Sequence, residues 1–199
     1  MTGPDGLPVA LFGSHDAWTA WLAEHHASSA GLWLQIAKRG STIRSVTYEE
    51  ALGGALAFGW IDGQKAPLDA AWWLQRFTPR RPGSPWSKAN RDRAERLIAQ
   101  GAMRPSGLSQ VESAQADGRW ERAYDGQRAA TVPDDLRAAL AAHPAAEAFF
   151  ATLDGANRYA VLYRVQDAKR PETRARRIER LVAMLASGET LHPSRGPRP

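Results

Sequence analysis

The residues best suited to chemistry are crowded into the stretch from Phe58 to Asn90. It contains the motif FGWIDG, the pair Trp72 and Trp73, and the run RFTPRRPGSPWSKAN. Four of the chain's eight tryptophans therefore lie among arginine, serine and asparagine side chains. Aromatic surface combined with a few polar groups is typical of a ligand site. The stretch matches the signature of no known reaction.

The second part of this stretch, the arginine-rich loop, predicts an anion site. A helix is expected to begin after Ser87, and backbone N–H groups at a helix N-terminus, together with guanidinium groups, favour phosphate, sulfate or carboxylate. Alternatively the loop is structural: prolines stiffen it, Trp86 packs into the core and Ser87 only caps the helix. The candidate ligand-binding residues are Arg76, Arg80, Arg81, Ser84, Trp86, Ser87 and Asn90, with Lys88 beside them.

Asp62, inside FGWIDG, is the one weak candidate for a catalytic residue. A carboxylate beside aromatic surface can have a raised pKa and act as a general base, or it can pair with an arginine of the loop. Asp followed by Gly is more often a simple turn, which is the structural alternative here.

Several kinds of chemistry are excluded. Without cysteine there is no disulfide, no thiolate nucleophile and no cysteine-bound metal. The five histidines do not form HExxH or another familiar ligand spacing, and no GxSxG, Walker or GxGxxG motif is present. We therefore expect no metal and no cofactor, and a binding protein rather than an enzyme.

The basic residues suggest an anionic partner. The formal net charge is +5, and 22 of the 26 basic residues are arginine, which binds carboxylate or phosphate with two parallel hydrogen bonds. A genome-wide bias toward arginine and alanine is the simpler explanation.

The segment AKRPETRARRIER raises the alternative of nucleic-acid binding. A basic helix face can follow phosphates, and the aromatic residues of the first half can stack on bases. Against this, Glu172 and Glu179 compensate part of the charge, as on a solvated or internally paired face. The arginines concerned are Arg174, Arg176, Arg177 and Arg180.

The chain shows no sign of a membrane protein. No apolar run reaches the roughly 20 residues that a membrane span needs. The sequence MTGPDGLPVALFGSHDAW has neither a basic nor a sustained apolar region, so a secretory signal is not expected. These features predict a cytoplasmic protein.

Hydrophobic periodicity predicts an α+β fold with two domains. Residues 10–124 combine helices with a small strand region of antiparallel type, and residues 132–188 form an all-helical domain. A disordered tail is expected at 189–199. The elements of the first domain are a helix at 15–26, a strand at 31–38, a helix at 47–58, a strand at 71–78, and helices at 87–101 and 107–117. Thr47 and Glu50, on either side of Tyr48 and Glu49, have the spacing of a capping box, and alternation places Trp73 and Arg76 on opposite faces of their strand. The last helix, from Pro171 to Ser187, carries an apolar stripe of Ile178, Leu181, Val182 and Leu185.

Several motifs carry a family resemblance. YEEAL, FGWIDG, FTPRR, SPWSKAN and GRW in the first half, and AKRPETRARRI in the second, are similar to motifs of the bacterial YdeI/OmpD-associated family, also called bacteriocin-protection proteins. The resemblance extends from Ser14 to Gly188 and is most specific at Ala168 to Ile178. It implies a role in survival against antimicrobial peptides or bacteriocins and a link to an outer-membrane porin, without a general catalytic mechanism.

Together these patterns predict a non-catalytic binding protein of this family, linked to envelope stress or antimicrobial-peptide tolerance. We expect it to recognise an anionic group, on a small molecule or a partner protein, through the arginine-rich loop. Simple capture of cationic peptides is disfavoured because a protein of net positive charge repels them at long range. Nucleic-acid binding and an enzyme using Asp62 remain the alternatives.

Overall fold

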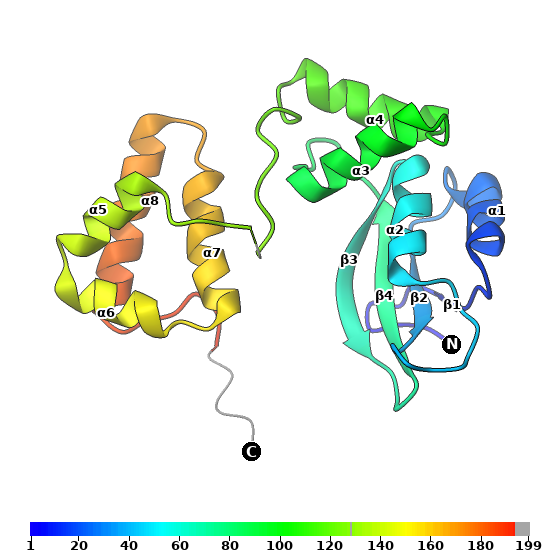
Figure 1. Cartoon of the computed structure of the whole chain (residues 1–199), viewed down its shortest axis with the longest axis horizontal. Helices are drawn as coiled ribbons and strands as arrows, with labels where there is room; N and C mark the ends of the chain where they lie inside the picture. Colours follow the sequence, from blue (N-terminus) through cyan, green and yellow to red (C-terminus); the bar gives the residue numbers. More distant parts are fainter. Residues whose placement is uncertain (128, 194–199) are drawn as a thin grey trace. The chain divides into compact units, whose positions relative to one another are not determined.

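The computed structural model describes residues 1–127 and 129–193, and the chain divides into two compact units. The first comprises Met1–Ala123 and contains the sheet, whereas the second begins at Tyr124 and is helical (Figure 1). The α+β fold class predicted from the sequence is confirmed.

A mixed sheet with the strand order β1-β2-β4-β3 forms the centre of the first unit. β1 pairs with β2 in parallel, which the sequence did not predict, because two residues are too few to show alternation. The other two pairs are antiparallel, as expected. The strands are β1 (Val9–Ala10), β2 (Leu32–Ala37), β3 (Trp60–Pro67) and β4 (Trp72–Pro79).

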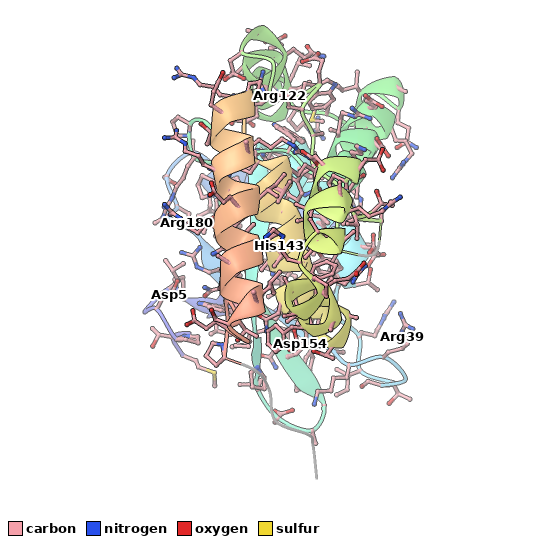
Figure 2. All side chains as sticks on the ribbon, turned by 90° about the vertical axis from the view of Figure 1, so that its left-hand side faces the viewer. Asp5, Arg39, Arg122, His143, Asp154 and Arg180 are labelled. Atoms are coloured by element: carbon pink, nitrogen blue, oxygen red, sulfur yellow. The ribbon has the colours of Figure 1, made fainter. Side chains whose placement is uncertain are left out.

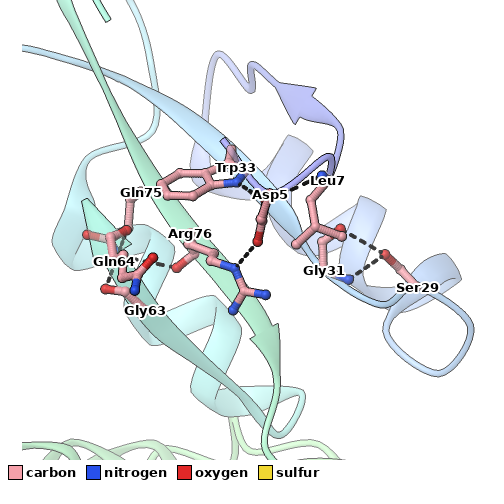
Figure 3. Close-up of polar contacts among 9 residues, drawn as sticks. All are labelled: Asp5, Leu7, Ser29, Gly31, Trp33, Gly63, Gln64, Gln75 and Arg76. Carbon is pink, nitrogen blue, oxygen red and sulfur yellow. Dashed lines mark hydrogen bonds and ion pairs between the residues drawn. The ribbon is translucent and has the colours of Figure 1, made fainter. Parts of the chain in front are cut away.

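The turn predicted at Asp62 and Gly63 is instead a β-bulge inside β3. The register with β4 shifts between Asp62 and Lys65. The Nε2 group of Gln75, a fully buried residue of β4, donates to the carbonyls of Gly63 (2.8 Å) and Gln64 (3.2 Å), which lie in the bulge (Figure 3). Glycine marks both turns and bulges, so composition alone did not distinguish them.

The two faces of the sheet differ, as the alternation of β2 and β4 predicts. Leu34, Ile36 and Phe77 belong to the buried core beneath the helices, and Trp73 packs against it. α1 (His15–His25) and α2 (Tyr48–Ala57) lie on this side of the sheet (Figure 1). We call the other side, toward which Trp33, Leu74 and Arg76 point, the open face.

The packing of α1 on α2 depends on one tryptophan and one glycine. Trp18 is completely buried, and its Nε1–H group donates to the carbonyl of Ala51 at 2.9 Å. A Cβ atom added to Gly54 would lie 3.0 Å from the Trp18 ring. The small residue lets the two helices approach closely.

α3 (Lys88–Ala99) and α4 (Pro105–Ala116) lie beyond one end of the sheet (Figure 1). The Ser87 side chain caps α3, as predicted, by accepting a hydrogen bond at that helix's N-terminus. α4 approaches α2 so closely at Gly107 that an added Cβ atom would lie 2.3 Å from the carbonyl oxygen of Ala57.

The second unit is built from the helices that its sequence periodicity predicts. The predicted apolar stripe of the last helix is buried in their common core. In the described residues from Tyr124 on, the helices are α5 (Asp134–Ala141), α6 (Pro144–Thr152), α7 (Gly155–Gln166) and α8 (Pro171–Ala186), and the stripe consists of Ile178, Leu181, Val182 and Leu185.

The predicted tail, 189–199, lies partly outside the described residues, which end at 193. In the described part Leu191 packs against the helical core, and the backbone N–H of His192 donates to Asn157 Oδ1 at 2.9 Å. None of the helices in residues 1–127 and 129–193 is long and apolar enough to cross a membrane.

Candidate functional site

Arg80, at the start of the arginine-rich loop, is buried rather than presented to solvent. It is only 6% exposed, and its guanidinium carbon lies 3.9 Å from the centroid of the Trp86 ring. Its Nη2 group donates to the carbonyl of Pro85 at 2.8 Å and more weakly to that of Ser84 at 3.4 Å. In this arrangement the charge of Arg80 is directed toward its own loop.

The rest of the loop is fastened from both sides. Trp86 is buried and meets Trp120 edge to face, with ring centroids 4.9 Å apart. Arg119, the neighbour of Trp120, donates to the carbonyl of Ser84 at 2.8 Å. Ser87 accepts from the backbone N–H of Asn90 at 3.2 Å. The aromatic residues and the cap of this loop therefore hold its conformation.

The candidate arginines do not meet at one place. Arg76 lies on the open face, where its Nε group donates to Asp5 Oδ2 at 2.6 Å. Arg80 is buried, and Arg81 is exposed. Asp62 lies on the helix side of the sheet, so it is separated by the sheet from Arg76. Anion binding by the exposed part of the loop stays a prediction.

Asp62 has a specific partner that the sequence did not reveal. Tyr48, the first residue of α2, donates its hydroxyl to Asp62 Oδ2 at 2.8 Å. Thr47 and Glu50 form a capping box that fixes this end of the helix. Burial and the negative charge of Asp62 raise the pKa of the Tyr48 phenol above its usual value, so this group remains a hydrogen-bond donor at neutral pH.

The bulge in β3 brings Lys65 to the same side of the sheet as Asp62. Residues three apart on a regular strand point to opposite faces, but the shifted register reverses this for Lys65. Its Nζ atom lies 5.3 Å from the centroid of the Tyr48 ring and 5.0 Å from that of Trp73. Two aromatic rings thus orient one ammonium group.

These residues line a pocket of about 550 Å³, which we call the lysine pocket. One wall consists of the apolar surface of Ile36 and Trp73, and the other is the loop that follows β2. The loop contributes cationic and hydroxyl side chains. The lining comprises Ile36, Ala37, Lys38, Arg39, Gly40, Ser41, Ile43, Ser45, Thr47, Tyr48, Glu49, Lys65 and Trp73.

Positive charge predominates in the lysine pocket. Three cations line it, whereas the one carboxylate of the lining, that of Glu49, forms an ion pair with Arg93. Lys38 is held by a hydrogen bond from its Nζ group to the carbonyl of Asp69 at 2.6 Å. Arg39 is exposed and projects from its loop (Figure 2). Such a pocket suits an anion that also has an apolar or aromatic part.

Most of this pocket could not be predicted from the sequence. Neither Lys65 nor Tyr48 is among the candidate ligand-binding residues. Two of the chain's four lysines, Lys38 and Lys65, line the pocket, and in an arginine-rich chain this was an available signal. Their proximity depends on the bulge and on the pairing of β2 with β4, which no local pattern specifies.

The second unit contains an apolar groove of about 710 Å³ between α5 and α8. His143 lies beside it, between these helices in Figure 2. At one end Arg174 forms two hydrogen bonds with the Asp135 carboxylate, at 2.5 and 2.8 Å, and a third with the carbonyl of Val165. Arg177 donates to Asp167 Oδ2 at 3.1 Å. These two arginines of the basic helix are thus paired within the unit.

No part of the chain that the structure describes gathers three or more His, Asp or Glu side chains in a way that suits a metal ion. The lysine pocket, with its cations, suits an anionic ligand instead.

Comparison with protein families gives two matches. The model described as "Domain of unknown function (DUF8412)" matches residues 10–110, which include both the lysine pocket and the arginine-rich loop. The model described as "Bacteriocin-protection, YdeI or OmpD-Associated" matches residues 129–188. That resemblance is thus confirmed for the second half, and the first half matches a separate model. No curated protein and no solved structure matches the chain. The DUF8412 model covers just over half of the residues of this chain. The chain therefore belongs to the DUF8412 family, with a YdeI/OmpD-associated domain at 129–188.

Proposed function

We propose that this protein is a non-catalytic binding protein that recognises a small organic anion in the lysine pocket. The observation that supports the proposal most strongly is the placement of Lys65 over the rings of Tyr48 and Trp73, at 5.3 and 5.0 Å. A ring face attracts an ammonium group without neutralising its charge. Lys38 and Arg39 add two more positive charges to the same hollow.

The chemistry of the lining suggests the class of ligand. A phosphate or carboxylate would contact the cations, and an aromatic or other apolar body would lie against Trp73 and Ile36. The protonated hydroxyl of Tyr48 donates a hydrogen bond to Asp62. In this proposal the pair Tyr48 and Asp62 positions the Tyr48 ring in the pocket wall and does not transfer protons.

The wider role that we propose is antimicrobial-peptide or bacteriocin tolerance and envelope stress, in line with the description of the family that matches residues 129–188. Under this proposal the protein acts by sensing or sequestering an anionic small molecule. Long-range repulsion by its positive charge disfavours direct capture of cationic peptides.

Isothermal titration calorimetry with three probes tests the proposal. Phenyl phosphate carries both a charge and a ring, inorganic phosphate carries only the charge, and benzyl alcohol has a ring without a charge. We expect phenyl phosphate to bind best. Replacing Lys65 by Met should weaken its binding by about tenfold or more, because a charge-assisted hydrogen bond contributes about 1.5–3 kcal/mol.

Lys169→Met is the matched control, because it removes the same charge from an exposed position of the second unit. It should leave the affinity for phenyl phosphate unchanged. Equal losses in both variants would reduce the effect to net charge and refute a specific pocket. If a nucleic acid bound tightly and lost affinity equally in both variants, the alternative of an arginine-rich nucleic-acid surface would replace the proposal.

A further inference from the structure

The open face of the sheet carries two buried residues that lie outside the helix-covered core. Trp33 and Leu74 are only 2% and 4% exposed, yet neither belongs to the cluster that packs under α1 and α2. Trp33 and Arg76 are direct partners in the register of β2 with β4. Both side chains therefore come from paired strands, which fix their separation.

The N-terminal residues Met1–Leu7, which we call the strap, cover Trp33. The strap is folded on itself by a hydrogen bond from the Gly3 N–H to the Leu7 carbonyl at 2.8 Å. Gly3 lies directly on the indole, because a Cβ atom added there would be 2.1 Å from a carbon of the Trp33 ring. Most of the strap is exposed on its other side.

The strap places one carboxylate between two fixed donors. Asp5 accepts from Trp33 Nε1 at 2.6 Å through Oδ1 and from Arg76 Nε at 2.6 Å through Oδ2 (Figure 3). The Leu7 N–H also donates to Oδ1, at 3.3 Å. The stem of Arg76 runs past Gly63, where an added Cβ atom would be 3.5 Å away. Strands, and not the strap, thus position both donors.

We propose that Trp33 and Arg76 form a receptor for a peptide carboxylate, and that Asp5 occupies it as a built-in competitor. The partner that fits is a tight turn of another protein with glycine two residues before an aspartate, as in Gly3-Pro4-Asp5, where the Gly6 N–H donates to the Gly3 carbonyl at 3.0 Å. Glycine is required because the indole leaves no room for a Cβ atom. The lysine pocket lies on the other face of the sheet, so this site does not depend on the proposed function.

The strap is suited to displacement. Its contacts with the open face include one ion pair between partly exposed groups, with Asp5 37% and Arg76 26% exposed. Exposed ion pairs contribute little net stability. A receptor site that its own chain occupies for most of the time binds an external peptide more weakly. Its apparent affinity is the affinity of the open site multiplied by the fraction of time that the site is open.

Full-length variants test this inference with the strap's own sequence as the probe. Gly3→Ala should lift the strap, whereas Gly13→Ala is the control, because nothing lies within 4 Å of a Cβ atom added at Gly13. The probe is the peptide MTGPDGLP, labelled at its C-terminus and followed by fluorescence anisotropy. We expect Gly3→Ala to bind it about tenfold more tightly than the wild type and Gly13→Ala do.

Two further measurements identify the contact. A probe with asparagine in place of its aspartate should not bind, and Arg76→Gln in the Gly3→Ala background should abolish binding. Asp5→Asn, which keeps the length of the strap, should also raise affinity for the unmodified probe. The inference is overturned if the asparagine probe binds equally well, or if Gly3→Ala forms a dimer by exchanging straps and leaves no site for the probe.

Discussion

The sharpest prediction compares two neighbouring arginines, Arg80 and Arg81. Arg80 stacks on Trp86 at 3.9 Å and donates to the carbonyl of Pro85 at 2.8 Å, whereas Arg81 is exposed. A hydrogen bond from a charged donor contributes about 1.5–3 kcal/mol. A cation over an aromatic ring contributes about 0.5–2 kcal/mol. Methionine retains part of the apolar contact, so Arg80→Met should lower the free energy of unfolding by about 2–4 kcal/mol.

Arg81→Met removes the same charge one residue away and should change the free energy of unfolding by no more than about 0.5 kcal/mol. Urea unfolding followed by tryptophan fluorescence is the appropriate assay, because all eight tryptophans lie within the unit Met1–Ala123. With a urea dependence of about 1–3 kcal/mol per molar, Arg80→Met should lower the midpoint by roughly 1 M or more. Equal effects of the two substitutions would refute a structural role specific to Arg80.

Three further predictions concern the sheet, the helices and the strap. Gln75→Leu leaves the carbonyls of Gly63 and Gln64 without their side-chain donor, so it should lower the free energy of unfolding by about 1–3 kcal/mol in the same urea assay. A decrease below about 0.5 kcal/mol would show that water replaces the amide. Gly107→Ala should destabilise the protein by about 1–3 kcal/mol, because its Cβ atom would meet the Ala57 carbonyl. Gly53→Ala should stabilise the protein by about 0.5–1 kcal/mol, because nothing lies within 4 Å of a Cβ atom added there. If Gly53→Ala were instead the less stable of the two variants, the described packing of α4 on α2 would be contradicted. The hydrogen bond from Trp33, aided by Arg76, lowers the pKa of Asp5 from 3.8 to about 2. The contact between the strap and the open face should therefore be complete above pH 4 and lost as the pH falls toward 2. The indole N–H resonance of Trp33 should report this change, and a midpoint near 3.8 would argue against the contact.

Local patterns predicted the elements whose signals lie within one segment. The capping box at Thr47 and Glu50, the Ser87 cap, and the apolar stripe of the last helix correspond to observed features. Alternation along β2 and β4 also assigned Trp73 and Arg76 to opposite faces of the sheet. These features depend on interactions between residues close in sequence, which is why they can be read from one segment.

The features that local patterns did not predict depend on distant partners. The bulge at Gly63 is stabilised by Gln75 on the next strand, and only the fold brings that amide to the two carbonyls. Burial of Arg80 depends on its stacking on Trp86, which is itself packed against the distant Trp120. For Asp62, the decisive partner was the hydroxyl of Tyr48, fourteen residues earlier and on another element.

Amide chemical-shift mapping with phenyl phosphate tests the lysine pocket most directly. The proposed function predicts saturable shifts at residues 38–48, at Lys65 and at the indole N–H of Trp73, which Lys65→Met weakens and Lys169→Met does not. Shifts confined to residues 80–90, or no shift at millimolar phenyl phosphate, would contradict anion binding in the lysine pocket.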